Sequence, residues 1–331
     1  MKKIVVGIFF INFIFCNGKY GDAFLGLGTS ARDIGIGQAV VADLGNPSGF
    51  NVCPASIGGI HNKVIYLLLI NQYGLAEYFS AGIVIPLRRN HFIGVNTSGF
   101  MIDNLQYRPD LSGLKSLEAR RDSIRSLLNN GFESFNDLEF AATITFAKMN
   151  QGSFSPLLLN PIIYKLPIGI NIRLIRKKLY ELESSGIGFD IGAMLSLPMS
   201  DLFSYKWLGT LSFGLSINHA FGTHLFWNND KQDIIPMQLI TGINIRQPIQ
   251  KIHSHISILV QQNNLYPDDR QFGFELTSFQ RLSLRMGYEN ETMQGGIGFL
   301  AKINKIPIRI DYSFSDHILG SAHRLGLQFK F

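Results

Sequence analysis

The segment His323–Phe331, with the sequence HRLGLQFKF, alternates strictly between apolar and other side chains. On an extended chain one face carries Leu325, Leu327, Phe329 and Phe331, and the other carries Arg324, Gly326, Gln328 and Lys330. Successive side chains of a strand point to opposite faces of a sheet, so this alternation predicts a β-strand with one apolar face. A strand of this kind that ends on an aromatic residue is typical of the closing strand of a transmembrane barrel.

The same alternation recurs along most of the chain. The apolar faces carry almost no charge, and the other faces are rich in Gly, Ser, Asn and single charges. A charge on the lipid face costs about 2–4 kcal/mol near the bilayer midplane, which explains this sorting. The sequence therefore predicts an all-β fold, an antiparallel transmembrane β-barrel of about 14 strands. The predicted strands start near residues 63, 76, 90, 138, 160, 185, 208, 236, 251, 270, 281, 294, 306 and 321.

Composition supports the membrane assignment. Only 16% of the residues are charged, against about 25% in ordinary soluble domains. Beyond the N-terminus the longest apolar run is Val64–Ile70, far short of the roughly 20 residues of a helical span. A soluble β-sandwich also alternates, but the uncharged apolar faces favour a barrel in lipid. The net charge of +6 is scattered, so no nucleic-acid partner is expected.

The N-terminus predicts export. Residues 1–18 combine two lysines with an apolar stretch of signal-peptide length, and we expect cleavage after Gly18 and localisation in a bacterial outer membrane. The alternative is a lipoprotein signal with Cys16 as the lipidated residue. After cleavage Cys53 is the remaining cysteine, so it has no disulfide partner and is expected to be a small buried residue. No metal or cofactor is expected.

Residues 19–62 are rich in Gly and small residues and predict a compact plug inside the barrel formed by residues 63–331. Gly26, Gly28 and Ala31 match the dinucleotide fingerprint. That motif needs a preceding strand and a βαβ unit, so nucleotide binding is not expected. Val64–Ile70 is apolar on both faces, which predicts that its inner face packs on the plug.

Strand number and turn length predict the topology. Short turns at Arg88–Asn90, Pro248–Lys251 and Asn304–Lys305 should face the periplasm, and long loops should lie outside, at 102–137, 222–235 and 264–270. The first loop contains apolar residues at helical spacing over 114–128, followed by the stop signal Asn129–Gly131. We expect a helix there, either capping the barrel mouth or docking a partner.

The predicted inner faces carry charges of both signs. We expect them to brace the wall or hold the plug, with an ion pair among Arg309, Arg324 and Asp311. His253 and His255 are predicted to share one strand face, either as solvated lumen residues or as metal ligands. No nucleophile–base set is fixed by spacing, so an enzyme is not expected. The predicted lumen-wall residues are Arg173, Asp190, Arg246, Glu275, Arg285, Arg309, Asp311 and Arg324.

Four apolar residues also fall on the predicted inner faces. They are expected to pack against the plug or to line an apolar pocket of a channel. They are Met194, Ile240, Leu259 and Leu300.

The plug segment contains a set of short motifs, formed by Phe24, Leu25, Ala31, Arg32, Gly35, Gly37 and Pro54. This set resembles the opening of PorV/PorQ-type outer-membrane proteins. Two later blocks, Gly169–Asp190 and Asp311–Phe331, are similar to the family's central strand pair and C-terminal hairpin. Cys53 and Ser56 stand where the family has the Asn and Gly of its NPAG motif, and the acidic stretch is reduced to Asp43.

The resemblance implies a barrel of FadL-like architecture. It also implies a non-enzymatic role in type IX-like protein secretion or surface attachment, in which secreted cargo or a surface-attachment protein docks at the outer loops. The remaining implied partners are outer-membrane lipid and the barrel assembly machinery, which would recognise Leu327, Phe329 and Phe331. The alternative is a FadL-like channel for hydrophobic small molecules.

Overall fold

The computed structural model describes residues 23–331 except 108–109, 115, 156–160, 304–305 and 318–319. The predicted signal peptide, residues 1–18, lies outside the described residues, as does the predicted turn Asn304–Lys305.

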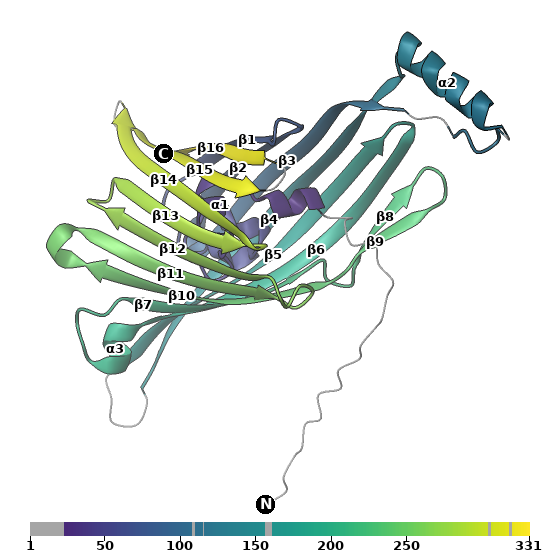
Figure 1. The fold of residues 1–331 in the computed structure, drawn as a ribbon. Helices are drawn as coiled ribbons and strands as arrows, with labels where there is room; N and C mark the ends of the chain where they lie inside the picture. Colours follow the sequence, from purple (N-terminus) through teal and green to yellow (C-terminus); the bar gives the residue numbers. More distant parts are fainter. Residues whose placement is uncertain (1–22, 108–109, 115, 156–160, 304–305, 318–319) are drawn as a thin grey trace, which may run out of the picture.

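Fourteen antiparallel strands form a closed ring, which confirms the predicted fold class (Figure 1). Each predicted strand corresponds to one strand of this ring. The barrel strands are β1 (Val64–Gln72), β2 (Ala76–Pro86), β3 (His91–Gln106), β4 (Ser134–Phe154), β5 (Ile162–Leu179), β6 (Leu182–Pro198), β7 (Thr210–Asn218), β10 (Gln238–Ile249), β11 (Ser254–Asn263), β12 (Arg270–Ser278), β13 (Leu282–Glu289), β14 (Thr292–Ile303), β15 (Ile306–His317) and β16 (Gly320–Lys330).

The ring closes where β1 pairs with β16. The register is continuous from Val64 opposite Lys330 to Gln72 opposite Ala322. Beyond it, the backbone of Phe331 donates to Lys63 at 2.9 Å and accepts from Lys63 at 3.2 Å. This closure removes the unpaired sheet edges that a hydrocarbon environment does not tolerate.

Side chains alternate between the two sides of the wall as predicted. On β5, Ile170, Ile172 and Leu174 face outward and are exposed, whereas Asn171 and Arg173 face inward and are buried. The outward positions would meet lipid and the inward positions meet the plug. Alternate residues along each strand are therefore apolar on one side and small or polar on the other.

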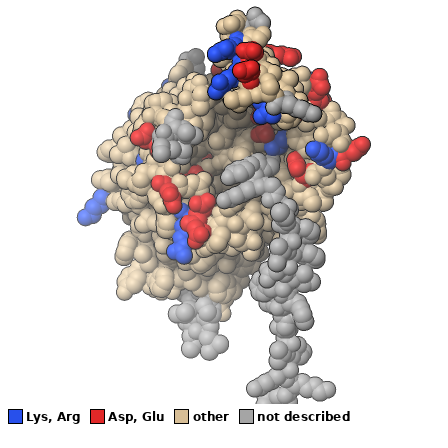
Figure 2. Space-filling model, turned by 45° about the vertical axis from the view of Figure 1, so that its right-hand side comes forward, with Lys and Arg blue, Asp and Glu red and all other residues tan. Residues whose placement is uncertain are grey.

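The two longest strand connections, β3–β4 and β7–β10, lie at one end of the barrel, which we call the long-loop end. The β3–β4 connection there carries α2 (Leu117–Asn130), which begins at the N-cap Ser116 and ends before Gly131 at φ +83°. The expectation that this helix caps the barrel mouth is wrong, because α2 stands away from the barrel (Figure 1). Its apolar residues Leu117, Ile124 and Leu128 are exposed. Charged side chains gather at the top of the molecule around this region (Figure 2).

Two predicted loops contain more regular structure than expected. β3 and β4 extend into the predicted loop 102–137. The predicted loop 222–235 folds into a hairpin of β8 (Thr223–Trp227) and β9 (Gln232–Ile235), which pairs with β6 outside the closed ring. The connections at the opposite end are shorter than those two and include η4 (Arg88–Asn90), α3 (Met199–Phe203) and η5 (Gln250–Ile252).

The segment before β1 fills the lumen. It forms η1 (Ala23–Leu27), α1 (Ala31–Gly35), η2 (Gly49–Asn51) and η3 (Pro54–Ile57), inside the ring of strands (Figure 1). Apolar plug residues pack on apolar wall residues, for example Phe50 and Ile57 with Tyr66 on β1. This contact explains why β1 is apolar on both faces. In the described part of the chain, none of the helices has the length and apolar character needed to cross a membrane.

Candidate functional site

The plug backbone approaches the wall closely where the wall has glycine. A Cβ on Gly287 or Gly214 would overlap the plug backbone at Gly37 and Val41 respectively. A Cβ on Gly169 would lie 2.6 Å from the carbonyl of Pro54. Separations this short exclude any larger residue, so these glycines adapt the wall to this plug. The wall glycines whose added Cβ would meet plug atoms within 3.5 Å are Gly94, Gly169, Gly192, Gly214, Gly242, Gly273, Gly287, Gly296 and Gly326.

Arg32 in α1 connects the plug to the wall electrostatically. Its Nη2 lies 2.7 Å from Oε2 of Glu275 on β12, and its Nη1 lies 2.6 Å from Oδ2 of Asp43 in the plug. Burial lowers the pKa of Arg32, but Asp43, Glu275 and Asp33 outweigh burial and hold this pKa well above its ordinary value. The guanidinium is therefore a permanent positive charge between plug and wall.

The wall continues this charge network. Arg285 lies 2.8 Å from both Glu275 and Asp311, and Arg309 lies 3.1 Å from Asp311. The guanidinium groups of Arg32, Arg285 and Arg309 thus alternate with three carboxylates, those of Asp43, Glu275 and Asp311. This pairing offsets the cost of burying each charge.

A second charged contact lies on the other side of the lumen. Nη2 of Arg173 lies 2.8 Å from Oδ2 of Asp190 and also donates to the carbonyl of Asn51 in the plug at 2.9 Å. Asn171 donates to Phe50 O at 2.8 Å and to Asp190 at 3.0 Å. The predicted lumen-wall charges Arg173 and Asp190 are therefore paired and hold the plug.

Two sequence-based expectations about the inner wall need correction, and one of two alternatives for His253 and His255 is disfavoured. Arg324 does not join Asp311: its Nη1 donates to Ser315 at 2.9 Å. His253 lies in the η5 turn at φ +46°, not on a strand face beside His255. His255 instead lies 2.9 Å from Nη2 of Arg246, which opposes metal binding, and the described residues contain no metal-ligand cluster.

The motif residues of the plug all lie at contacts with the wall or within the plug fold. Phe24 is buried against Ala141, Ile175 and the β8–β9 hairpin. Gly35 approaches Gly296, and Pro54 approaches Gly169 and Gly192. Met194, Ile240 and Leu259 pack on the plug, while Leu300 lies near the end of β14.

A cavity of about 460 Å³ lies on the plug at the long-loop end of the lumen. Plug residues Leu25, Leu27 and Val52 contribute an apolar floor, and the wall contributes mostly amides. Nδ2 of Asn51 and Nε of Arg173 have no hydrogen-bond partner among the described residues. The wall residues that line the cavity include Gln238, Gln261, Asn263, Gln271 and Glu289.

Glu289 is the acidic centre of this cavity wall. Gln38 of the plug donates to both of its carboxylate oxygens at 3.0 Å, Gln271 donates to Oε1 at 2.8 Å, and Gln294 donates to Oε2 at 3.0 Å. Among the described residues, the hydrogen-bond partners of this carboxylate are thus all neutral amides. Sequence reasoning missed this cluster, because its members come from the plug and three strands and share no spacing.

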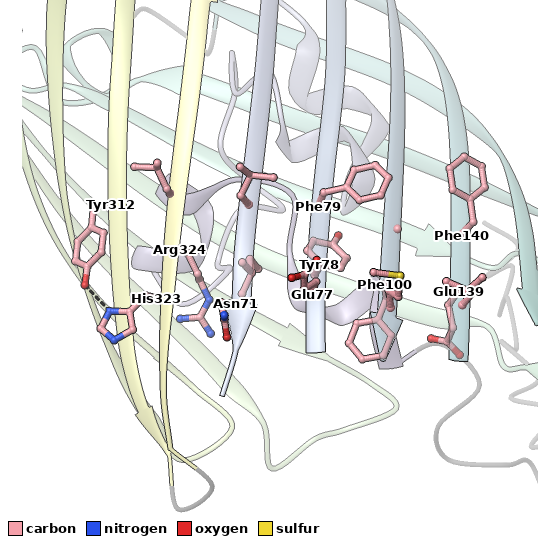
Figure 3. A pocket seen from close by; sticks show the side chains of 16 residues that line it. Asn71, Glu77, Tyr78, Phe79, Phe100, Glu139, Phe140, Tyr312, His323 and Arg324 are labelled. Carbon is pink, nitrogen blue, oxygen red and sulfur yellow. Dashed lines mark hydrogen bonds between the residues drawn. The ribbon is translucent and has the colours of Figure 1, made fainter. Parts of the chain in front are cut away.

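A second, larger hollow of about 750 Å³ lies over β15, β16, β1, β2, β3 and β4 (Figure 3). Its lining includes Leu69, Phe79, Phe140 and Leu325, whose side chains are 42–51% exposed on the outer face. Gly99 lies between the two phenylalanines in the strand register, where the ring of Phe79 covers it. The site is therefore a groove in the lipid-facing side of the wall, which we call the outer groove.

No protein-family model matches the sequence, and no curated protein matches it. Solved structures of similar fold include the Pseudomonas putida toluene transporter TodX, with 10% identity, 92% of this chain and 98% of that chain covered, and a TM-score of 0.44. The Ralstonia pickettii toluene transporter TbuX is 11% identical, and the match covers 92% of this chain and 97% of that chain with a TM-score of 0.40. The Acinetobacter baumannii outer membrane protein Omp33 is 10% identical, and the match covers 82% of this chain and 98% of that chain with a TM-score of 0.34. The likeness is one of fold.

Proposed function

We propose that the chain is a plugged outer-membrane channel of FadL-like architecture. Its substrates would be small molecules that combine an apolar part with hydrogen-bonding groups. The observation that supports this function is the lumen cavity on the plug, which has an apolar floor and an amide-rich wall. Ligand sites of this mixed kind bind the apolar part by burial and orient the polar part by hydrogen bonds.

The cavity chemistry favours a particular class of hydrophobic compound. Asn51 and Arg173 bring donor groups to the cavity lining, and Gln238, Gln261 and Asn263 bring side-chain amides. A pure hydrocarbon would displace water from such polar groups without offering them hydrogen bonds, at a cost of about 1–3 kcal/mol for each group left unpaired. A fatty acid or an aromatic acid would satisfy the donors and still cover the leucines.

Uptake by the purified full-length protein in liposomes tests this function. Radiolabelled laurate and benzoate should enter protein-containing liposomes faster than empty ones, and glucose should not. Leu25→Trp, which fills the cavity floor, should reduce the rate. Leu75→Trp in the exposed β1–β2 turn is the control and should leave the rate unchanged. Equal uptake by liposomes with and without the protein would refute the proposal.

A second candidate is the secretion or surface-attachment role implied by the resemblance to PorV/PorQ-type proteins. One observation favours it: α2 projects from the long-loop end with Leu117, Ile124 and Leu128 exposed. In that role, secreted cargo or a surface-attachment protein would dock on α2. Deletion of the gene should then trap secreted proteins in the periplasm and leave laurate uptake unchanged. The opposite pattern would favour the channel.

A further inference from the structure

The outer groove is built from two rows of outward side chains. In the strand register, Phe140, Gly99, Phe79, Leu69, Leu325 and Tyr312 follow one another across β4, β3, β2, β1, β16 and β15. This apolar row forms the body of the groove. The next row toward the long-loop end contains Leu138, Met101, Glu77, Asn71 and His323.

The lining shows that the groove lies outside the barrel. On β1, β2, β3, β4 and β16 the lining residues form triplets such as Leu69–Asn71 and Glu77–Phe79. The outer members of each triplet point to the lipid side, and the middle member points inward. Tyr78, for example, donates to Gly28 O of the plug at 2.7 Å. The continuous pairing of β1 with β2 and β16 separates the groove from the lumen.

The row nearer the long-loop end gives the groove a polar edge (Figure 3). The hydroxyl of Tyr312 and Nδ1 of His323 lie 2.7 Å apart. Glu77 is exposed and makes no ion pair with any described residue. A carboxylate beside an apolar surface favours a cationic partner from outside the chain, because the low-dielectric surroundings strengthen their attraction.

We propose that the outer groove binds one membrane lipid with a primary amine in its head group. The acyl chain crosses the apolar row over Leu69, between Phe79 on one side and Leu325 on the other. The ammonium group pairs with Glu77 at the polar edge. This site lies on the opposite side of the wall from the cavity of the proposed channel and does not depend on it.

Native mass spectrometry of the purified full-length protein tests the site. The probes are phosphatidylethanolamine and phosphatidylglycerol with identical acyl chains, supplied at equal amounts. The wild type should retain one lipid and prefer phosphatidylethanolamine by roughly two- to fivefold, the size expected of a partly exposed ion pair. Glu77→Gln keeps the shape of the side chain and should remove this preference.

A matched pair of tryptophan variants tests the groove itself. Leu69→Trp fills the apolar row and should abolish retention of either lipid. Leu284→Trp on β13 introduces the same side chain at an outward position of nearly equal exposure, 49% against 51%, and should leave retention unchanged. Equal retention of both lipids by the wild type, equal effects of the two tryptophans, or a dimer that covers the groove would each overturn the proposal.

Discussion

Arg32 links the plug to the wall through ion pairs. Its guanidinium contacts Asp43 in the plug and Glu275 on β12 at once. Loss of one member of a buried charge network leaves the others uncompensated, at a cost of about 3–5 kcal/mol. We infer that the position of the plug depends on this residue.

Arg32→Met should therefore loosen the plug and produce frequent open events in planar-bilayer conductance recordings. Arg32→Lys should give an intermediate effect, because it keeps the charge but loses the planar fork that contacts two carboxylates. Arg121→Met on exposed α2 is the control. Wild-type conductance in Arg32→Met would contradict this role of Arg32.

The reactivity of the Cys53 thiol measures whether the plug stays closed. Burial raises the pKa of its thiol to about 12, and the side chain is fully buried. At pH 8 roughly one thiol in ten thousand is then the reactive thiolate, and its fraction grows only as the pH rises toward 12. N-ethylmaleimide should leave the folded protein unlabelled at pH 8 and label the urea-unfolded protein completely, as measured by intact mass. Rapid labelling of the folded protein would show that the plug opens.

At the scale of the elements, several barrel strands have a glycine at the point where the plug comes close to them. Gly287 on β13 has no space for a side chain because the backbone of Gly37 lies against it. Gly295 on neighbouring β14 has nothing within 4 Å of an added Cβ. Gly287 thus faces the plug, whereas Gly295 is paired with the exposed Met286 on the outward face of the wall.

Gly287→Ala should destabilise plug docking by about 1–3 kcal/mol, the usual cost of overpacking, and Gly295→Ala should have no effect. Limited proteolysis of the plug followed by mass spectrometry measures the difference. Equal protection of the plug in both variants would show that it does not need this contact.

The strands could be predicted from the sequence because, within each one, outward apolar residues alternate with inward small or polar residues. This pattern lies within a single short segment and needs no knowledge of the rest of the fold. The β8–β9 hairpin could not be predicted, because Thr223–Trp227 is short and pairs outside the closed ring. The Arg32–Glu275 contact was also beyond sequence reasoning: both residues were singled out, but 243 positions separate them. Only the fold brings such residues together, and the same holds for the two rows of the outer groove.

For the whole molecule, closure depends on the pairing of β1 with β16. Phe331 extends this ladder through its two backbone hydrogen bonds to Lys63 and exposes its ring, at 58%. The proposed assembly signal of Leu327, Phe329 and Phe331 lies on this last strand.

Deletion of Phe331 should lower the amount of heat-modifiable protein in isolated outer membranes, because it removes the aromatic end of this signal and the last pair of the ladder. Phe221→Ala removes a ring that is 92% exposed between β7 and β8 and should leave the amount unchanged. Normal levels of the deletion variant would contradict an assembly role for Phe331.

The close fit of plug and wall also constrains how the sequence can evolve. A larger residue at a plug position such as Val41 or Pro54 meets wall atoms that have no room to move, and a larger residue at the facing glycine fails for the same reason. Descendants of this chain are therefore expected to change plug and wall together, in compensating pairs. Exchange of the plug alone between two such barrels should fail unless the facing glycines are exchanged with it.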